Sequence, residues 1–306
     1  MKNLRFLLSL TNDDNDYQIE QTIAAQHAAR KLGVDLEIVY ARNDGIVQSQ
    51  QLLSSIQSTT APRPDAILFE PAGSTAHPQV ARAAAAAGIG VALLNRDADY
   101  IPELRSLFPV PVFAVTSDHE EIGRIQGQQL SAMLPDGGIV LCIQGPAESL
   151  AAKQRYTGLL ETKPNGVQLR VVRAQWTEAS AYKTVGSFLG LSTSRQARIE
   201  AVCAQDDSMA MGARKAFEEC PELLEQCRNM PFLGCDGLPR TGQEWVRRKL
   251  LAATISIPPN ADLAMETMVK SIASKTLPPE RTFTTPKSLP SIEALTRTVR
   301  ARAASL

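Results

Sequence analysis

The sequence predicts an α/β fold with parallel sheets, arranged as two similar lobes. The first observation is that short apolar runs alternate with helical segments of about ten or more residues. This alternation is typical of βαβ units. The second observation is that this alternation is interrupted at residues 100–112 and then resumes. The third is that several apolar runs end in polar residues, at the sheet edge where open parallel sheets bind ligands.

The first series of elements precedes the break. The expected strands are 4–10, 34–40, 66–69 and 91–94, and the expected helices are 19–32, 46–56 and 78–87. Gly33 and Gly88 follow two of these helices, at the position where glycine commonly ends a helix. We interpret residues 100–112 as an irregular excursion, because three prolines interrupt the segment.

The second series repeats the pattern. The expected strands are 112–115, 139–143, 167–172, 201–204 and 232–235, and the expected helices are 120–133, 149–160, 179–189 and 209–217. A strand at 251–257, a helix at 261–272 and extended chain at 282–289 would return the chain between the lobes and form a hinge. The prediction is an N-terminal lobe of residues 1–117 plus 257–282, and a C-terminal lobe of residues 118–256 plus 283–306, joined by a three-segment hinge.

Composition excludes some classes of partner. Lys and Arg number 32, Asp and Glu also number 32, and the formal net charge is zero. Nucleic-acid binding normally leaves a basic excess, so we expect no nucleic-acid partner. The apolar run at residues 4–10 is too short to span a membrane, so no direct membrane insertion is expected. It also lacks a signal-peptide cleavage site, so either a leader was removed before this numbering begins or the protein is not exported.

The chain carries no sign of a cofactor, a metal or a catalytic centre. No Gly-x-Gly-x-x-Gly follows the first strand, no phosphate-binding Gly-Lys-Ser/Thr loop occurs, and no Gly-x-Ser-x-Gly elbow occurs. The three histidines lack metal-ligand spacing, and the five cysteines lack zinc-site spacing. We expect the cysteines to be free thiols, which mildly favours a reducing compartment. No cofactor, no metal and no enzymatic activity are expected.

Two adjacent acids stand at the end of one predicted strand. Asp206 and Asp207 follow the buried run 201–204, and a helix of small residues starts directly behind them. One acid can cap this helix by accepting backbone N–H groups, while the other faces a ligand. We expect Asp207 to be the cap and Asp206 to contact the ligand.

Several short stretches resemble a known family in their order and spacing. They are Leu94-Asn95-Arg96-Asp97-Ala98, Ala151-Ala152-Lys153-Gln154-Arg155, residues 204–213, Gly234-Cys235-Asp236-Gly237 and Leu251-Ala252-Ala253-Thr254-Ile255. The chain resembles the type I periplasmic binding proteins, in particular their ribose-binding-like sugar-binding branch. That branch shares its two-lobed fold with the ligand-sensing domains of LacI-type repressors. The resemblance covers nearly the whole length.

The resemblance implies a set of ligand-binding residues, which also suit the chemistry of a sugar. Planar bidentate groups recognise hydroxyl edges, and aromatic rings recognise the faces of a sugar. The expected ligand-binding residues are Asn15, Tyr17, Asn95 and Arg96 in the first lobe and Arg155, Trp176, Asp206 and Asp236 in the second. Each also has a plainer interpretation, as a cap, a turn residue, a core residue or a solvated charge.

Departures from the ribose-binding pattern favour a different ligand. Gln18 follows Tyr17 where an aromatic pair is common, and Asn95 stands where an acid usually precedes the arginine. Asp206 stands where the pattern has asparagine, and Ile257 occupies a hinge position that is often glutamine. A differently substituted sugar or a polyol is therefore expected in place of ribose.

The resemblance implies a solute-binding protein that closes on a sugar or polyol in the interlobe cleft and delivers it to an ABC-type importer. Its partners would then be the small molecule and an ABC permease, and its location the periplasm or cell envelope. The alternative is a cytoplasmic ligand-sensing module that acts through a partner protein, which the lack of a signal peptide and the free cysteines favour. A third possibility, an α/β enzyme that acts on a sugar, is supported only by the similarity of the fold.

Overall fold

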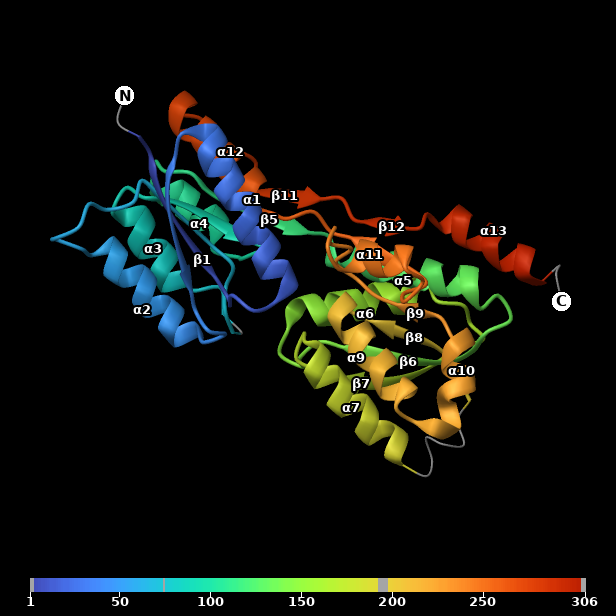
Figure 1. Cartoon of the computed structure of the whole chain (residues 1–306). Coiled ribbons are helices and arrows are strands. Elements are labelled where there is room, and N and C mark those ends of the chain that lie inside the picture. The colour runs from blue at the N-terminus through green and yellow to red at the C-terminus, as the bar shows by residue number, and fades with distance from the viewer. Residues whose placement is uncertain (1–2, 74, 192–197, 304–306) are drawn as a thin grey trace. The chain divides into compact units, whose positions relative to one another are not determined.

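The computed structural model describes residues 3–73, 75–191 and 198–303 (Figure 1). The chain forms two compact units: Met1–Ser117 with Pro258–Thr284, and Asp118–Ile257 with Thr285–Leu306. The chain therefore passes from one unit to the other three times. Each unit is a parallel sheet covered by helices, so the predicted α/β class is confirmed.

The first unit contains a six-stranded parallel sheet in the order β11-β5-β4-β3-β1-β2. Its strands are β1 (Arg5–Leu10), β2 (Asp35–Tyr40), β3 (Ala66–Phe69), β4 (Gly90–Leu94), β5 (Val112–Ser117) and β11 (Arg281–Thr284). Its helices are α1 (Asp16–Leu32), α2 (Gly45–Ile56), α3 (Pro78–Ala86), α4 (Ile101–Leu107) and α12 (Ala261–Ser274). The strand order reverses between β1 and β3, which is where ligands bind in such sheets.

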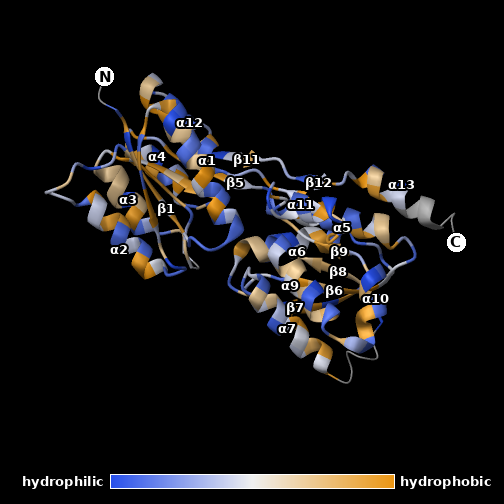
Figure 2. Ribbon diagram, in the orientation of Figure 1, coloured by the Kyte–Doolittle hydropathy of each residue, from blue (hydrophilic) through white to orange (hydrophobic). Residues whose placement is uncertain are grey.

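Both faces of this sheet are buried because successive side chains of a strand point to opposite sides. Phe6 and Leu8 belong to the core formed with α1 and α12. Leu7 belongs to the opposite core, formed with α2, α3 and α4. Figure 2 shows the consequence, since β1 and its neighbours are largely hydrophobic while the covering helices carry many hydrophilic residues.

The segment expected to be irregular contains a helix. Residues 101–107 form α4, with Ile101 and Leu104 buried in the core. Pro102 lies in the first turn, where a helix needs no backbone N–H donor, so proline is tolerated there. Pro109 and Pro111 lie beyond the end of the helix. The three prolines bracket a short helix and do not abolish it.

The second unit contains a four-stranded parallel sheet in the order β7-β6-β8-β9, and a separate antiparallel pair, β10 with β12. The strands are β6 (Gly138–Gln144), β7 (Val167–Arg173), β8 (Ile199–Ala204), β9 (Phe232–Leu233), β10 (Thr254–Ser256) and β12 (Lys287–Leu289). The helices are α5 (His119–Met133), α6 (Leu150–Thr162), α7 (Glu178–Gly190), α9 (Asp207–Glu218), η1 (Pro221–Leu223), α10 (Leu224–Asn229), α11 (Gly242–Arg247) and α13 (Ile292–Ala303).

The extended chain expected at 282–289 is two separate strands. β11 pairs with β5 in the first unit, and β12 pairs with β10 in the second. The strands expected at 232–235 and 251–257 are also shorter, since β9 and β10 cover only two and three residues. Isolated bridges at Leu233–Ala253 and Asp236–Ser256 continue the contact between these two segments.

Two glycines allow α5 and α6 to pack closely. A Cβ atom on Gly123 would lie 2.0 Å from the carbonyl oxygen of Arg155, and one on Gly158 would lie 1.9 Å from that of Glu120. Larger side chains at either glycine would force the two backbones apart. The close contact fixes the position of α6 and therefore the origin of the Arg155 side chain.

The cysteines are free, and four of the five are buried. Burial raises the pKa of the Cys142 thiol to about 12 and raises that of Cys203 well above its ordinary value. These thiols are protonated at neutral pH and act as core residues. Among the helices that the structure describes, none has the length and apolar character needed to cross a membrane.

Candidate functional site

The first predicted group begins just after β1. Asn15 is the N-cap of α1, and its side-chain oxygen accepts hydrogen bonds from the backbone N–H groups of Tyr17 and Gln18. Tyr17 is buried, and its hydroxyl donates to the carbonyl oxygen of Pro258 at 3.3 Å. Pro258 is the first residue of the returning segment of this unit. Tyr17 therefore links the start of α1 to the segment that leads into α12.

Asn95 and Arg96 lie at the carboxyl end of β4, as expected. The side-chain amide nitrogen Nδ2 of Asn95 donates to Oε1 of Glu70 at 3.1 Å. The guanidinium of Arg96 donates to the carbonyl oxygens of Gly73 and Thr75, at 3.0 and 3.4 Å. Arg96 therefore also supports the loop that follows β3. Its contact with a ligand stays a prediction.

Glu70 is a residue of this site that sequence reasoning missed. It directly follows β3, and its second carboxylate oxygen accepts from Nε2 of Gln18 at 2.9 Å. Burial raises the pKa of this carboxyl, while hydrogen bonds from Gln18 and Asn95 and the charge of Arg96 oppose the rise. Glu70 therefore connects the polar residues after β1 with those after β4. Its place behind a buried strand was the signal that could have identified it.

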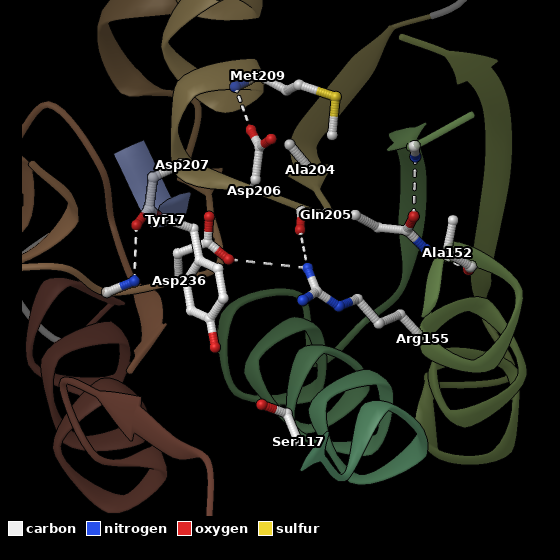
Figure 3. Close-up of polar contacts among 12 residues, drawn as sticks. Tyr17, Ser117, Ala152, Arg155, Ala204, Gln205, Asp206, Asp207, Met209 and Asp236 are labelled. Atoms are coloured by element: carbon white, nitrogen blue, oxygen red, sulfur yellow. Dashed lines mark hydrogen bonds and ion pairs between the residues drawn. The ribbon is translucent and has the colours of Figure 1, made fainter. Parts of the chain in front are cut away.

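Arg155 is the centre of the second predicted group (Figure 3). Arg155 lies on α6 and is 6% exposed, and its Nη1 donates to the backbone carbonyl of Gln205. The same nitrogen lies 3.9 Å from Oδ1 of Asp236, which is also largely buried. The guanidinium carbon lies 5.7 Å from the centre of the Trp176 ring, within the range of a cation–π contact. Arg155, Trp176 and Asp236 therefore form one cluster.

Gln205 organises this cluster and was also missed. Its Oε1 accepts from the backbone N–H of Gly145 at 2.9 Å, and its Nε2 donates to the carbonyl oxygen of Ala152 at 2.9 Å (Figure 3). The residue is buried between the end of β8 and the loop from β6 to α6. Gln205 ties the first turn of α6 to β8 and places its own carbonyl against Arg155. It directly follows β8 and precedes Asp206, and this position at a strand end was its sequence signal.

The expected roles of the two adjacent acids are partly wrong. Asp206 is the N-cap of α9, with extended backbone and an Oδ1 that accepts from the N–H of Met209 at 2.5 Å. Asp207 is the first helical residue, and it does not cap the helix. Its Oδ2 accepts from the N–H of Gly237 at 2.8 Å and its Oδ1 from the hydroxyl of Thr254 at 2.6 Å.

The backbone explains why Asp206 is the cap. An N-cap needs extended backbone so that its side chain can turn back to the first-turn N–H groups, and Asp206 has φ −146° and ψ 167°. The side chain of Asp207 instead joins the segments after β9 and before β10. Capping by one oxygen of Asp206 is compatible with a ligand contact, so its predicted binding role stays a prediction.

Three of the predicted residues have strained backbone. Eight non-glycine residues of the described chain have positive φ, and they include Asn95 (55°), Trp176 (59°) and Asp236 (103°). Such a conformation costs of order 1–3 kcal/mol for a non-glycine residue and persists only where the surrounding structure enforces it. Strain of this kind concentrates at binding and catalytic sites. It supports a functional role for these three residues, independently of their resemblance to a family.

The ring of Trp176 rests directly on Gly145. A Cβ atom on Gly145 would lie 2.0 Å from one ring carbon of Trp176, which is far inside van der Waals contact. We therefore expect Gly145→Ala to displace the ring and shift the fluorescence of Trp176, measured in a Trp245→Phe background. Gly186→Ala is the matched control, because nothing lies within 4 Å of a Cβ there. Equal spectra for the two alanine variants would contradict this packing.

The structure brings the predicted residues together within each unit. In the first unit, Glu70 and Gln18 connect the surroundings of Asn15 and Tyr17 with Asn95. In the second unit, Arg155 contacts Trp176, Gln205 and Asp236. Asp206 directly follows Gln205 in the chain. A shared cavity between the two groups stays a prediction. No cluster of three or more potential metal ligands occurs in the parts of the chain that the structure describes.

A model of the periplasmic binding protein domain matches residues 6–276. The chain belongs to this family. The ribose-binding-like resemblance predicted from the sequence is confirmed, and the family is typically periplasmic.

Individual members support this assignment. The chain is 26% identical to the ribose import binding protein of Escherichia coli over 243 residues, which is 79% of this chain and 75% of the relative. It is 25% identical to the galactofuranose-binding protein of Escherichia coli over 280 residues, 90% of this chain and 84% of the relative. Both relatives are named as binding proteins, which fits the expectation of a non-enzymatic role.

A solved structure shows the same fold. An ABC transporter periplasmic solute-binding protein from Actinobacillus succinogenes, crystallised with bound D-allose, has a TM-score of 0.80 and 21% identity. The match covers 96% of this chain and 100% of that one. The predicted architecture of two α/β lobes with parallel sheets is that of the solved family members.

Proposed function

We propose that this protein is a solute-binding protein that binds a sugar or a polyol between its two lobes. The observation that carries the proposal is the cluster of Arg155, Asp236 and Trp176 at the carboxyl ends of the second sheet. It combines an acceptor, a planar donor and an aromatic ring, which are the groups that recognise a polyhydroxylated ring. The first unit offers a comparable set at its own strand ends.

The charges of the two groups support an uncharged ligand. In the second unit the buried Arg155 lies beside Asp236, and in the first the charge of Arg96 faces Glu70. Each of the two arginines thus has an anionic neighbour, so neither group has an excess of positive charge that would attract an anion. A neutral molecule with many hydroxyls can satisfy donors and acceptors of both kinds.

The ligand departs from ribose in this proposal. Glu70 supplies a carboxylate at the end of β3, while the residue before Arg96 is an amide that donates to it. The ribose-binding-like pattern has its acid before the arginine. This chain therefore presents its acceptors in a different order along the sheet edge. A sugar or polyol with a different arrangement of hydroxyls fits this order.

Delivery of the ligand to an ABC permease at the cell envelope is part of the proposal. Its support is membership of the family and the names of the relatives. Because a ligand held between two lobes contacts both only when they are closed, binding would favour the closed form. The closed form is then the state that a permease can distinguish from the empty protein.

A thermal-shift panel tests the proposal directly. The panel comprises D-ribose, D-allose, L-arabinose, D-galactose, myo-inositol and glycerol. A ligand present at about 100 times its Kd stabilises the folded state by about 2.7 kcal/mol, which raises the Tm by several degrees. We expect at least one panel member to do so, and calorimetry to give one site per chain.

The same experiment contains its controls. Buffers that contain sodium chloride or urea at the concentration of the sugar control for nonspecific stabilisation. NMR of the recovered sugar checks that the sugar is chemically unchanged. Absence of a shift with every sugar and polyol would count against the proposed function. Conversion of the sugar during incubation would favour an enzyme.

A further inference from the structure

The two ends of the loop between β3 and α3 are held by one atom. Gln48 lies on α2 and is fully buried. Its side-chain oxygen Oε1 accepts from the backbone N–H of Ala72 at 2.7 Å and lies 2.8 Å from Nε2 of His77. Ala72 is near the start of this β3–α3 loop, and His77 is its last residue before α3. A single oxygen therefore closes the loop.

Backbone groups with only one possible role fix the orientation of the Gln48 amide. A carbonyl oxygen can only accept a hydrogen bond, and a backbone N–H can only donate one. Nε2 of Gln48 donates to the carbonyl oxygen of Glu70 at 2.9 Å, so the NH₂ group lies on that side. The N–H of Ala72 requires the oxygen on the other side. The atom that faces His77 is therefore the amide oxygen.

This orientation determines the tautomer of the neutral His77 ring. The oxygen of Gln48 has no proton to give, so Nε2 of His77 carries the hydrogen. Nδ1 then accepts from the hydroxyl of Ser49 at 2.9 Å. His77 is 6% exposed and has φ 49°, a conformation that a non-glycine residue keeps only where its surroundings enforce it. The ring is therefore a fixed donor to Gln48.

The closed loop presents carbonyl oxygens to a predicted ligand-binding residue. Nη1 of Arg96 donates to the carbonyl oxygens of Gly73 and Thr75 at 3.0 and 3.4 Å. The hydroxyl of Tyr100 donates to the carbonyl oxygen of Ala76 at 2.5 Å. All three carbonyls belong to residues between the two clamped ends of the loop. Release of either end would therefore displace the acceptors that hold Arg96.

We propose that His77 is a positioning residue for Arg96, which acts by closing the β3–α3 loop on Gln48. The proposal rests on the proposed function and deepens it, because it names what holds one of the predicted ligand-binding side chains in place. His77 acts through the loop and does not need to touch the ligand. A guanidinium has five N–H donors, so the bonds of Arg96 to the loop are compatible with further bonds to a ligand.

The surroundings of the His77 ring favour its neutral form. Burial and then the charge of Arg96 lower its pKa from 6.5, and the backbone of Ala72 acts in the opposite direction. α2 presents an uncharged amide and a hydroxyl to the ring, and β3 presents the aromatic ring of Phe69. The carboxylate of Glu70 binds side chains of α1 and of the segment after β4. Arg96 is therefore the charge that opposes protonation of the ring.

The direction of the pH dependence follows from the lowered pKa of His77. Between this pKa and the ordinary value of 6.5, the unfolded chain binds a proton that the folded protein does not. The stability that comes from this residue is therefore fully present above pH 6.5 and declines as the pH falls through that window. Protonation at Nδ1 also places a second positive charge beside Arg96, so we expect ligand affinity to decline in the same direction.

NMR of the ring nitrogens tests the arrangement without any ligand. The signals of His77 are assigned in ¹⁵N-labelled protein by their loss in His77→Gln. At pH 7.5 we expect the tautomer with the hydrogen on Nε2, and a titration midpoint below 6.5. Arg96→Gln should raise this midpoint, because it removes the charge beside the ring. Arg82→Gln changes an exposed arginine of the same unit and should leave the midpoint unchanged.

Two replacements of His77 separate the hydrogen bond from the imidazole ring. Glutamine can place an amide N–H near the position of Nε2, whereas leucine has no donor. At pH 7.5, calorimetry with D-ribose, D-allose and myo-inositol is expected to show about ten-fold weaker binding of the wild type's ligand by His77→Leu, and a change within about two-fold for His77→Gln. The affinity of His77→Gln should not share the loss that the wild type shows below pH 6.5. Thermal unfolding of the ligand-free variants checks that those compared are folded.

The two proposals fail in different ways. A tautomer with the hydrogen on Nδ1, a midpoint that Arg96→Gln does not raise, or wild-type affinity in His77→Leu overturns the positioning role. Equal losses in His77→Leu and His77→Gln, or equal losses below pH 6.5 in the wild type and His77→Gln, also overturn it. Absence of binding by the wild type to every panel sugar instead overturns the proposed function, and the ligand-free NMR experiment then still decides how His77 is held.

Discussion

Replacement of Arg155 by alanine is expected to weaken sugar binding by about 100-fold or more, the largest functional effect of any single change. The side chain is 6% exposed, it donates to the carbonyl of Gln205, and it lies 3.9 Å from Asp236. A hydrogen bond that involves a charged group typically contributes about 1.5–3 kcal/mol, and alanine would remove every hydrogen bond that the guanidinium donates to the ligand. A loss of 100-fold corresponds to about 2.7 kcal/mol.

Two further variants separate binding from folding. Arg155→Lys keeps the charge but loses the planar pair of donors, so we expect an intermediate loss. Lys153→Ala changes an exposed residue on the same helix and should bind as the wild type does. All three are measured by calorimetry with the panel sugar that binds best, and circular dichroism confirms that each is folded. Wild-type affinity in Arg155→Ala would remove the arginine from the site.

Replacement of Asp207 by alanine is expected to have the largest effect on stability, about 3 kcal/mol. The carboxylate is buried and accepts from the N–H of Gly237 and the hydroxyl of Thr254. Each buried donor left without a partner costs about 1–3 kcal/mol, and the lost side chain also leaves a small cavity. For a unit of this size, the change lowers the Tm by roughly 6–12 °C.

Neighbouring substitutions show whether the hydrogen bonds are the cause. Thr254→Val removes one donor and keeps the shape, so it should cost less than Asp207→Ala. The double variant should cost less than the sum of the two single changes, because both remove the same contact. Asp136→Ala, at an exposed acid of the same unit, should leave the Tm within about a degree. A Tm in Asp207→Ala as high as in that control would contradict the structural role.

The fold was largely predictable because periodicity reports on packing. A strand such as β3, which is buried on both faces, must be apolar throughout, and α1 must end where Gly33 adopts a left-handed conformation. α4 was missed because a proline in the first turn of a helix looks the same in sequence as a proline that breaks one. The division of residues 282–289 into two strands depends on partners that are distant in sequence.

The sequence indicated candidate residues mainly where a strand end and the resemblance coincide, and the ligand contacts of these residues stay predictions. Glu70 and Gln205 also follow strands, but their roles depend on contacts with Asn95 and Gly145 that no local pattern encodes. The cap of α9 was expected at Asp207 and lies at Asp206, because adjacent acids look alike in sequence. Only the backbone conformation at the helix start distinguishes them. Tertiary contacts, rather than residue type, therefore decide these assignments.

The positive φ angles at Asn95, Trp176 and Asp236 have a consequence for engineering. A search for thermostable variants would find glycine attractive at all three positions, because glycine relieves the local strain. Each such change would also delete a side chain of the proposed binding site. If these residues bind the ligand as proposed, selection for heat resistance alone would reduce ligand affinity, and libraries built on this scaffold should hold these three positions constant.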